Sequence, residues 1–180
     1  GNLLQQTRCW YWRLDRPCRL NGRADSCGAR EGEHREHAIF ANRFCASAHP
    51  SDVAAALLAL GATVRTTRRE LPIGDLYRLP TADDRRTTVL APGELIVELD
   101  VPPADASVYL KAMDRQRFSF AIVGVAAVRR GAQTTVALAG AAPVPWLLDG
   151  PLDDATPLPG TAYKVQIARA LVERARTAVA

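Results

Sequence analysis

Lysine is almost absent from this chain of 180 residues. Of its 23 lysines and arginines only Lys111 and Lys164 are lysines, which leaves 21 arginines. A GC-rich coding bias accounts for such a skew, but a planar guanidinium cannot always replace a compact ammonium. A lysine that persists in an arginine-rich chain can therefore be held by chemistry. For Lys164, at the mouth of the last predicted helix, a solvated charge is the simpler expectation.

Long apolar runs are also lacking. No run approaches the roughly 18 residues that a transmembrane helix needs, so we expect no membrane-spanning segment. The chain opens with Gly1 rather than methionine, and no charged segment with an apolar core follows, so we expect no signal peptide. The net charge of +4 is too mild to indicate nucleic acid as a partner. With 48% hydrophobic and 23% charged residues, the composition is that of a globular protein with a packed core.

Regular secondary structure is predicted only after residue 48. Residues 5–48 show neither helical nor strand periodicity, and a loop of this length inside a compact domain is usually functional or disordered. Ser51 and Asp52 precede an apolar segment that ends at Gly61, which is the pattern of an N-cap, a helix over 53–60 and a C-cap. The remaining predicted elements are strands at 62–66, 69–73, 95–101, 107–113, 121–128 and 134–139, and an amphipathic helix at 162–179. Two prolines at 102–103 mark a boundary between units 1–103 and 104–180, and the fold class is α+β.

All four cysteines lie in the first quarter of the chain, so we treat Cys9, Cys18, Cys27 and Cys45 as parts of one structural or metal-binding site. Two disulfides suit a small secreted domain without a core, which this chain does not resemble. Structural zinc prefers close pairs of cysteines, whereas the gaps here are much longer. An iron–sulfur cluster accepts more varied spacings, because the loop wraps around a larger group. His34 and His37 could replace a ligand, although exposed loop histidines are the simpler interpretation.

The arginine-rich loop raises one further alternative, a domain that binds RNA or DNA. Its eight arginines are interleaved with five acidic residues. This alternation argues against a continuous anion-binding stripe.

The cysteines and their flanking residues together resemble a known family. The segments are Gly1-Asn2-Leu3-Leu4-Gln5-Gln6-Thr7-Arg8-Cys9-Trp10-Tyr11-Trp12, then Cys18, Cys27, Glu36-His37-Ala38-Ile39, Cys45 and His49-Pro50-Ser51-Asp52. They are similar to the FAD-binding subunit of the xanthine dehydrogenase and carbon monoxide dehydrogenase family of molybdenum hydroxylases. The specific branch is the bacterial aldehyde-oxidoreductase type, whose flavin subunit carries an extra [4Fe–4S] cluster in an inserted loop. All four cysteines match that insert, so the resemblance implies that they are the cluster ligands.

The resemblance continues to the end of the chain, with departures. The matching segments are Leu79-Pro80, Leu90 to Ile96, Tyr109 to Arg115, Leu138 to Trp146 and Leu158 to Val165. The implied fold is the C-terminal part of a flavin-binding α+β domain with a cysteine-rich loop at about 5–48. A small C-terminal domain, 104–180, follows, with a three-stranded antiparallel sheet plus helices. The family has roughly another hundred residues, about one domain, before the position of Gly1. These residues include the glycine-rich segment that cradles the FAD pyrophosphate, so the FAD site is expected to be incomplete here. The stretch between Trp146 and Leu158 is also shorter than in the family.

The resemblance also implies flavin-binding residues. Gly1 and Asn2 match the end of a turn that approaches the flavin, where glycine permits close approach and asparagine offers a donor and an acceptor. Lys111 matches a lysine near the ring, where a cation would stabilise the reduced flavin. The other implied positions are Leu4, Gln5, Ser51, Asp52, Leu95 and Ile96. From the pattern alone Ser51-Asp52 is an ordinary helix N-cap, and Leu95 and Ile96 are core strand residues.

The implied function is that of an electron-transfer subunit of an oxidoreductase, with no acid–base catalyst of its own. Electrons would pass from a molybdopterin-binding large subunit, through a [2Fe–2S] small subunit, to FAD and then to an acceptor. Neither nucleic acid nor membrane is an expected partner. The family implies a cytoplasmic location, or a periplasmic one through co-export with a partner. The alternative is a degenerate, non-redox module whose loop is stapled by zinc or disulfides.

Overall fold

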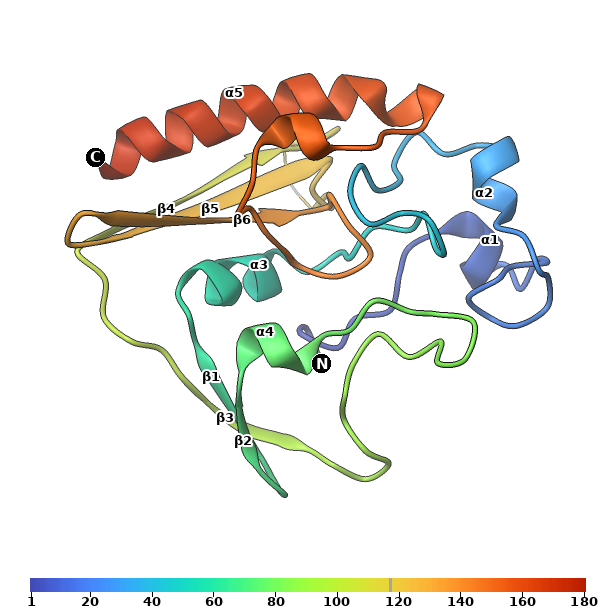
Figure 1. Cartoon of the computed structure of the whole chain (residues 1–180), viewed down its shortest axis with the longest axis horizontal. Coiled ribbons are helices and arrows are strands. Elements are labelled where there is room, and N and C mark those ends of the chain that lie inside the picture. The colour runs from blue at the N-terminus through green and yellow to red at the C-terminus, as the bar shows by residue number, and fades with distance from the viewer. Residues whose placement is uncertain (117) are drawn as a thin grey trace.

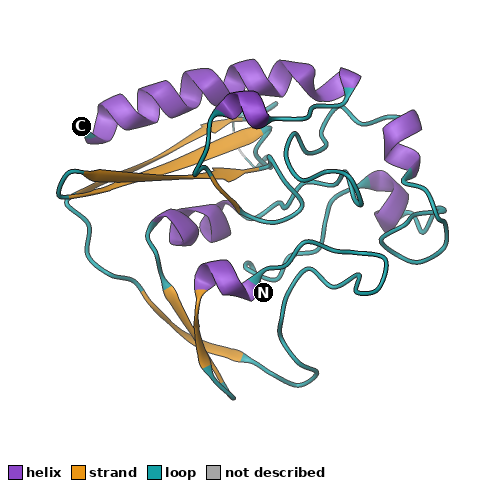
Figure 2. Cartoon of the chain, viewed as in Figure 1, coloured by secondary structure: helices purple, strands orange, loops and turns teal. Residues whose placement is uncertain are grey.

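The computed structural model describes residues 1–116 and 118–180, and it combines two antiparallel sheets with helices on both faces of the larger one (Figures 1 and 2). This arrangement confirms the predicted α+β fold class. An extended, loop-rich segment that carries the cysteines closes one end of the molecule. No described helix combines the length and the apolar character required to cross a lipid bilayer.

The smaller sheet has the strand order β2-β1-β3. Its strands are β1 (Thr63–Thr66), β2 (Glu70–Pro72) and β3 (Ile96–Asp100), and the single-turn helix α4 (Ile73–Leu76) follows β2. Val64, at the centre of the sheet, pairs with Leu71 on one side and Leu99 on the other. Val64 and Leu71 are buried and share a core with Leu57 of α3 (Asp52–Ala59), so the alternation of buried and exposed residues fixes which face of the sheet turns inward.

The larger sheet has the order β4-β5-β6-β7 and is antiparallel throughout. Its strands are β4 (Ala106–Ala112), β5 (Val123–Arg130), β6 (Gln133–Ala139) and β7 (Trp146–Leu147). The long helix α5 (Ala162–Val179) lies along one face and α3 packs on the other (Figure 1). The central strand β5 is therefore covered on both sides, which explains why its first six residues are all buried rather than alternating.

The sequence predicted the six longer strands and both longer helices to within about two residues. It missed β7, α4 and two short 3₁₀ helices, Leu152–Asp154 and Pro159–Thr161, since a single helical turn or a two-residue strand is too short to show a period. The larger sheet therefore has a fourth, very short strand beside the three predicted ones.

The sequence predicted an irregular loop at 5–48, but the structure shows some regular elements in it. They contain two single-turn helices, α1 (Trp10–Arg13) and α2 (Gly28–Glu31), and an isolated β-bridge between Cys18 and Cys27. Ile39 and Phe40 enter the core beneath α5, and their backbone N–H groups both donate to the carbonyl of Ala141. The loop is thus anchored to the C-terminal half of the chain at its far end, while α1 and α2 project to the right in Figure 1.

The division into units 1–103 and 104–180 stays a prediction. Pro102 and Pro103 do separate β3 from β4. However, Ala59 of α3 shares a small buried cluster with Ala126 and Ala137 of the larger sheet. The two halves therefore meet through a packed contact, and not only through the linker.

Candidate functional site

A cavity of about 550 Å³ opens between the first residues of the chain, the start of α3 and the segment after β4. This volume lies within the usual range for cofactor and small-molecule sites. Four of the nine predicted cofactor residues line it, namely Asn2, Gln5, Asp52 and Lys111. The structure therefore brings together residues that lie more than 100 positions apart in the sequence.

A half-buried ion pair forms one wall of this cavity. The Lys111 ammonium on β4 donates to Oδ2 of Asp52 at 2.6 Å and to the carbonyl of Ser119 at 2.7 Å. The hydroxyl of Tyr109 donates to the other carboxylate oxygen of Asp52 at 2.7 Å. Burial, and then the hydrogen bond to Asp52, raise the pKa of Tyr109 well above its usual range. The ammonium is thus fixed in position, and its charge is largely balanced by that of Asp52.

Ser51 combines the two roles that the sequence allowed for it. Its Oγ accepts a hydrogen bond from the N–H of Ala54 at 3.0 Å, which caps α3, and its hydroxyl donates to Oδ1 of Asn2 at 2.6 Å. Ser51 itself is fully buried and does not line the cavity. It therefore orients Asn2 rather than facing a ligand directly.

The other predicted cofactor residues lie outside the wall of this cavity. Gly1 is exposed, and Leu4 is half-buried. Leu95 immediately precedes β3 and is 63% exposed, while Ile96 begins β3 and packs against the core of the smaller sheet. The assignment of Leu95 and Ile96 to the flavin therefore stays a prediction.

Tyr109 is a contact of Asp52 that sequence reasoning missed, and Gly124 explains how it fits. Gly124 pairs with Lys111, and a Cβ atom on Gly124 would overlap the phenol ring of Tyr109, its diagonal neighbour on β4. The absence of a side chain at this position lets the ring lie over the strand and reach Asp52. A glycine inside a predicted strand, which often marks a close approach, was the available signal.

The four cysteines form a second group, in the loop. All four are free; Cys18, Cys27 and Cys45 are buried, and Cys9 is half-buried. Burial raises the pKa of the Cys9 thiol and raises that of Cys45 to about 11, and the charges of Cys18 and Cys27 contribute to both increases. A β-bridge joins Cys18 to Cys27, Cys9 packs against the small cluster that contains Cys27, and Cys45 shares a small cluster with Cys18, so all four lie in one region. The buried surroundings are mainly apolar, with Ala29, Ala46, Leu20 and Leu158 among them.

This arrangement differs from a mononuclear metal site. Within residues 1–116 and 118–180, no three His, Cys, Asp or Glu side chains converge on a point where they could hold one metal ion. A zinc ion requires its sulfur ligands at about 2.3 Å from a single centre. The described thiols therefore do not form a site for one metal ion.

Two polar side chains touch the cysteine sulfurs. Nε2 of His37 lies 3.2 Å from Sγ of Cys9, and Oγ of Ser47 lies 3.2 Å from Sγ of Cys45. The expectation of an exposed His37 was wrong, since only 4% of its surface is accessible. Burial, and then the nearby Lys164, lower the pKa of His37 to about 4.

Lys164 is not the solvated charge that the sequence suggested. It is fully buried, and its ammonium donates to the carbonyls of Gly140 at 2.6 Å, His37 at 2.8 Å and Glu36 at 3.4 Å. Desolvation lowers its pKa to about 7. Lys164 thus fixes the backbone of the cysteine loop to the first turn of α5, a contact that only the folded chain creates.

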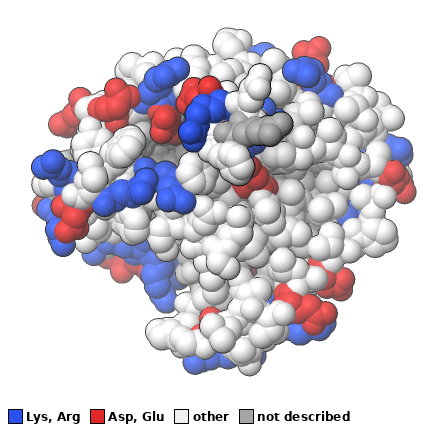
Figure 3. Space-filling model, turned by 180° about the vertical axis from the view of Figure 1, so that it is seen from behind, with Lys and Arg blue, Asp and Glu red and all other residues white. Residues whose placement is uncertain are grey.

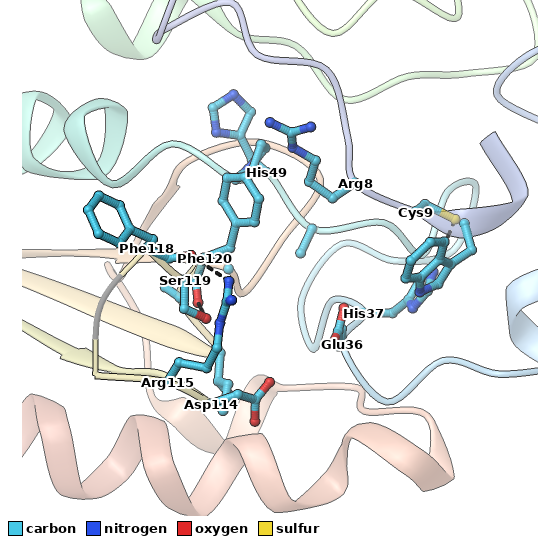
Figure 4. A pocket seen from close by; sticks show the side chains of 16 residues that line it. Arg8, Cys9, Glu36, His37, His49, Asp114, Arg115, Phe118, Ser119 and Phe120 are labelled. Carbon is cyan, nitrogen blue, oxygen red and sulfur yellow. Dashed lines mark hydrogen bonds between the residues drawn. The ribbon is translucent and has the colours of Figure 1, made fainter. Parts of the chain in front are cut away.

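A second cavity, of about 340 Å³, lies between the two groups (Figure 4). Cys9 and His37 line it on the side of the loop, and Asp114 and Arg115 line it on the side of β4. Four of its wall residues also line the first cavity: Pro50, Phe118, Ser119 and Phe120. This bridging cavity therefore runs from the Cys9 corner of the thiol group to the wall of the first cavity.

The charges on the loop do not form a patch of one sign. Arg23 pairs with Asp15 within the loop, and on the face seen in Figure 3 acidic and basic side chains lie next to one another. This mixture agrees with the sequence argument against a nucleic-acid-binding stripe.

One curated protein resembles the chain in sequence, and several solved structures resemble it in fold. No family model matches the chain. It is 37% identical over 159 residues to the aldehyde oxidoreductase FAD-binding subunit PaoB of Escherichia coli (strain K12), a match that covers 83% of this chain and 50% of that protein. The chain thus spans about half the length of this curated relative.

Solved structures share the fold. The carbon monoxide dehydrogenase of Hydrogenophaga pseudoflava that lacks the Mo-pyranopterin moiety matches with a TM-score of 0.60 and 22% identity, over 72% of this chain and 56% of that chain. Cu,Mo-CO dehydrogenase matches with a TM-score of 0.57 and 21% identity over the same shares. Quinoline 2-oxidoreductase from Pseudomonas putida 86 matches with a TM-score of 0.55 and 16% identity. At these identities the likeness is one of fold.

Proposed function

We infer that this chain belongs to the FAD-binding subunits of molybdenum hydroxylases, the group of oxidoreductase subunits in which its 37%-identical relative stands. One observation carries the functional proposal. A cavity walled by Asn2, Gln5, Asp52 and Lys111 adjoins a second cavity that reaches Cys9. The two groups of residues that the family resemblance assigns to different cofactors are therefore neighbours in space.

We propose that the first cavity holds part of the FAD. When bound, a flavin accepts and releases electrons and becomes more negative as it is reduced. The chain contributes position and charge. Asn2 is oriented by Ser51 and offers both a donor and an acceptor, and the Lys111 ammonium is held at the wall by Asp52 and Ser119. Since Asp52 balances most of the ammonium charge, the pair can tune the flavin without adding a full positive charge.

We further propose that Cys9, Cys18, Cys27 and Cys45 hold a [4Fe–4S] cluster. The residues fit this group in three respects. They are four free thiols, they lie close together in one loop region, and three of them are buried among apolar side chains. The cluster would supply one-electron transfer. The chain would provide the thiolates and shield them from solvent.

The proposed role in the complex is to receive electrons from a molybdenum-containing large subunit through a [2Fe–2S] small subunit, and to deliver them to an acceptor. Support comes from the FAD-binding subunit of an aldehyde oxidoreductase, which is similar in sequence, and from Cu,Mo-CO dehydrogenase, which shares the fold. A non-redox module stapled by zinc or disulfides is not favoured, because the described cysteines are unpaired and do not converge on one ion.

Metal and flavin analysis tests the proposal directly. The protein is purified anaerobically with its partner subunits, and iron, acid-labile sulfide, zinc and FAD are measured per chain. We expect iron and sulfide in equal amounts, about four of each in excess of those in the partner subunits, and one FAD. Substitution of all four cysteines by serine should remove that iron and leave the iron of the partner subunits unchanged. Zinc in place of iron, or iron that is unaffected by the substitutions, would contradict the cluster assignment.

A further inference from the structure

We propose that His37 and Ser47 are hydrogen-bond donors to two cysteine ligands of the cluster, Cys9 and Cys45, and that they raise its reduction potential. The inference rests on the proposed function, because it assumes that the cluster is present. It concerns residues for which neither the family resemblance nor the comparisons indicate a role.

The direction of both contacts follows from the chemistry of a ligand sulfur. A cysteine that binds iron is a thiolate and has no hydrogen to donate. Nε2 of His37, 3.2 Å from Sγ of Cys9, must then be the donor of that contact. The same argument reverses the contact at Cys45, so the hydroxyl of Ser47 donates to the sulfur.

The environment of His37 supports this assignment of its tautomer. Nδ1 of His37 is buried and has no hydrogen-bond partner among the described residues. A buried N–H without an acceptor is costly, so the proton belongs on Nε2, where the sulfur of Cys9 can accept it. Lys164 holds the carbonyl of His37 at 2.8 Å, and the N–H of His37 donates to the carbonyl of His34 at 2.9 Å. The imidazole is therefore held at the sulfur by a backbone fixed on both sides.

The donors are distributed unevenly over the four sulfurs. One side-chain donor contacts the sulfur of Cys9 and one contacts that of Cys45. In the described part of the chain no side-chain donor contacts the sulfur of Cys18 or Cys27. Hydrogen bonds to ligand sulfurs stabilise the more negative, reduced cluster and raise its potential. The two donor-rich corners should thus attract the added electron, and Cys9 is the corner that lines the bridging cavity.

Four variants of the holo-complex, measured beside the wild type, test the proposal. His37→Leu and Ser47→Ala each remove one side-chain donor. His37→Gln returns an amide N–H close to the place of Nε2 and is the conservative rescue. Ser26→Ala is the matched control, because Ser26 is exposed, adjoins Cys27 and makes no hydrogen bond to a sulfur. The midpoint potential of the cluster is obtained by titration with dithionite under electron paramagnetic resonance.

We expect the equilibrium constant for reduction to fall about threefold to tenfold in His37→Leu and in Ser47→Ala, where tenfold corresponds to 59 mV for one electron. His37→Gln should recover most of the loss, and Ser26→Ala should match the wild type. Transfer of the wild type to heavy water should also remove a proton hyperfine coupling of the reduced cluster. The part of that coupling that arises from the N–H of His37 should already be missing in His37→Leu.

The outcomes separate this inference from the proposed function. A wild type without the cluster would overturn both. A wild type with the cluster, whose potential and exchangeable coupling are unchanged in His37→Leu and Ser47→Ala, would overturn the inference and leave the cluster in place. If His37→Leu fails to assemble, two measurements still test the inference. One is the midpoint potential of His37→Gln and Ser47→Ala compared with that of Ser26→Ala, and the other is the deuterium effect in the wild type.

Discussion

Lys164 gives the sharpest test of how the cysteine loop is held. In a Lys164→Met variant the side chain keeps a stem of similar length but donates no hydrogen bond. The carbonyls of His37 and Gly140 then lose their contacts at 2.8 and 2.6 Å. A buried acceptor without a partner costs about 1–3 kcal/mol, and removal of a poorly solvated ammonium offsets part of that loss. At pH 7 we therefore expect the free energy of unfolding to fall by about 2 kcal/mol.

The effect should increase with pH. Desolvation lowers the pKa of Lys164 from 10.5 to about 7 in the folded chain. Between these values the unfolded chain binds a proton that the folded chain does not, so the stability of the wild type rises with pH. From pH 7 to pH 9 this gain is about 2 kcal/mol at about 1.36 kcal/mol per pKa unit, and the variant lacks it. The difference between the two proteins should therefore be roughly 4 kcal/mol at pH 9.

Urea unfolding followed by circular dichroism at pH 7 and pH 9 measures both quantities, with Arg174→Met as the control. Arg174 is an exposed residue of the same helix, and its replacement should change stability by no more than about 0.5 kcal/mol. Hydrogen exchange should in addition become faster at the amides of residues 36–38 in the Lys164 variant. Equal stability of the two variants at both pH values would refute the reasoning.

Three further predictions concern the first cavity and the smaller sheet. Asp52→Asn leaves the Lys111 ammonium without its counter-charge. The flavin midpoint potential in the holo-complex should therefore rise, by an amount that corresponds to a change in the free energy of reduction on the order of 1 kcal/mol. An unchanged potential in a redox titration would place the flavin elsewhere. Gly124→Ala forces the ring of Tyr109 away from Asp52 and should cost about 1–3 kcal/mol in thermal unfolding, whereas a wild-type melting temperature would show that the ring moves freely. The buried Glu94 carboxylate accepts hydrogen bonds from Ala91, Thr66 and Arg69. The bonds from Ala91 and Thr66 contribute most to lowering the pKa of Glu94 to about 2, so the stability that they provide above pH 4.5 should be lost as the pH falls toward 2. Glu94→Gln should remove that part of the acid sensitivity in unfolding curves.

Local signals in the sequence predicted the elements that local interactions determine. Ser51, Asp52 and Gly61 bound α3 as their capping chemistry requires, and the apolar positions of 162–179 predict α5 with its observed bounds. The short strand β7 could not be predicted, because two residues contain less than one period of any pattern and depend on pairing with β6. The fold class followed from the longer elements alone.

Some features of the candidate site could be predicted from the sequence, and others depend on contacts between distant residues. The grouping of the four cysteines was predictable because they are close in the sequence. His37 could not be placed, because its burial depends on Lys164, 127 residues further along the chain, and on a turn at Gly140. For Leu95 and Ile96 the assignment to the flavin rests on the family resemblance alone and stays a prediction. Ile96 pairs with Thr66 of β1, and neither residue lines the first cavity.

Lys111 and Lys164 share one feature that arginine does not provide. In a chain where arginine fills nearly every basic position, each lysine makes at least two contacts of 2.6–2.8 Å from a single nitrogen. Lys164 does so inside a fully closed space, and Lys111 does so between a helix start and a loop. A guanidinium spreads its donors over a plane, so it cannot bring one nitrogen to the same set of acceptors. The retained lysines therefore mark two points where a single nitrogen donates to several acceptors. One holds the cysteine loop to the C-terminal helix, and the other fixes the wall of the proposed flavin cavity.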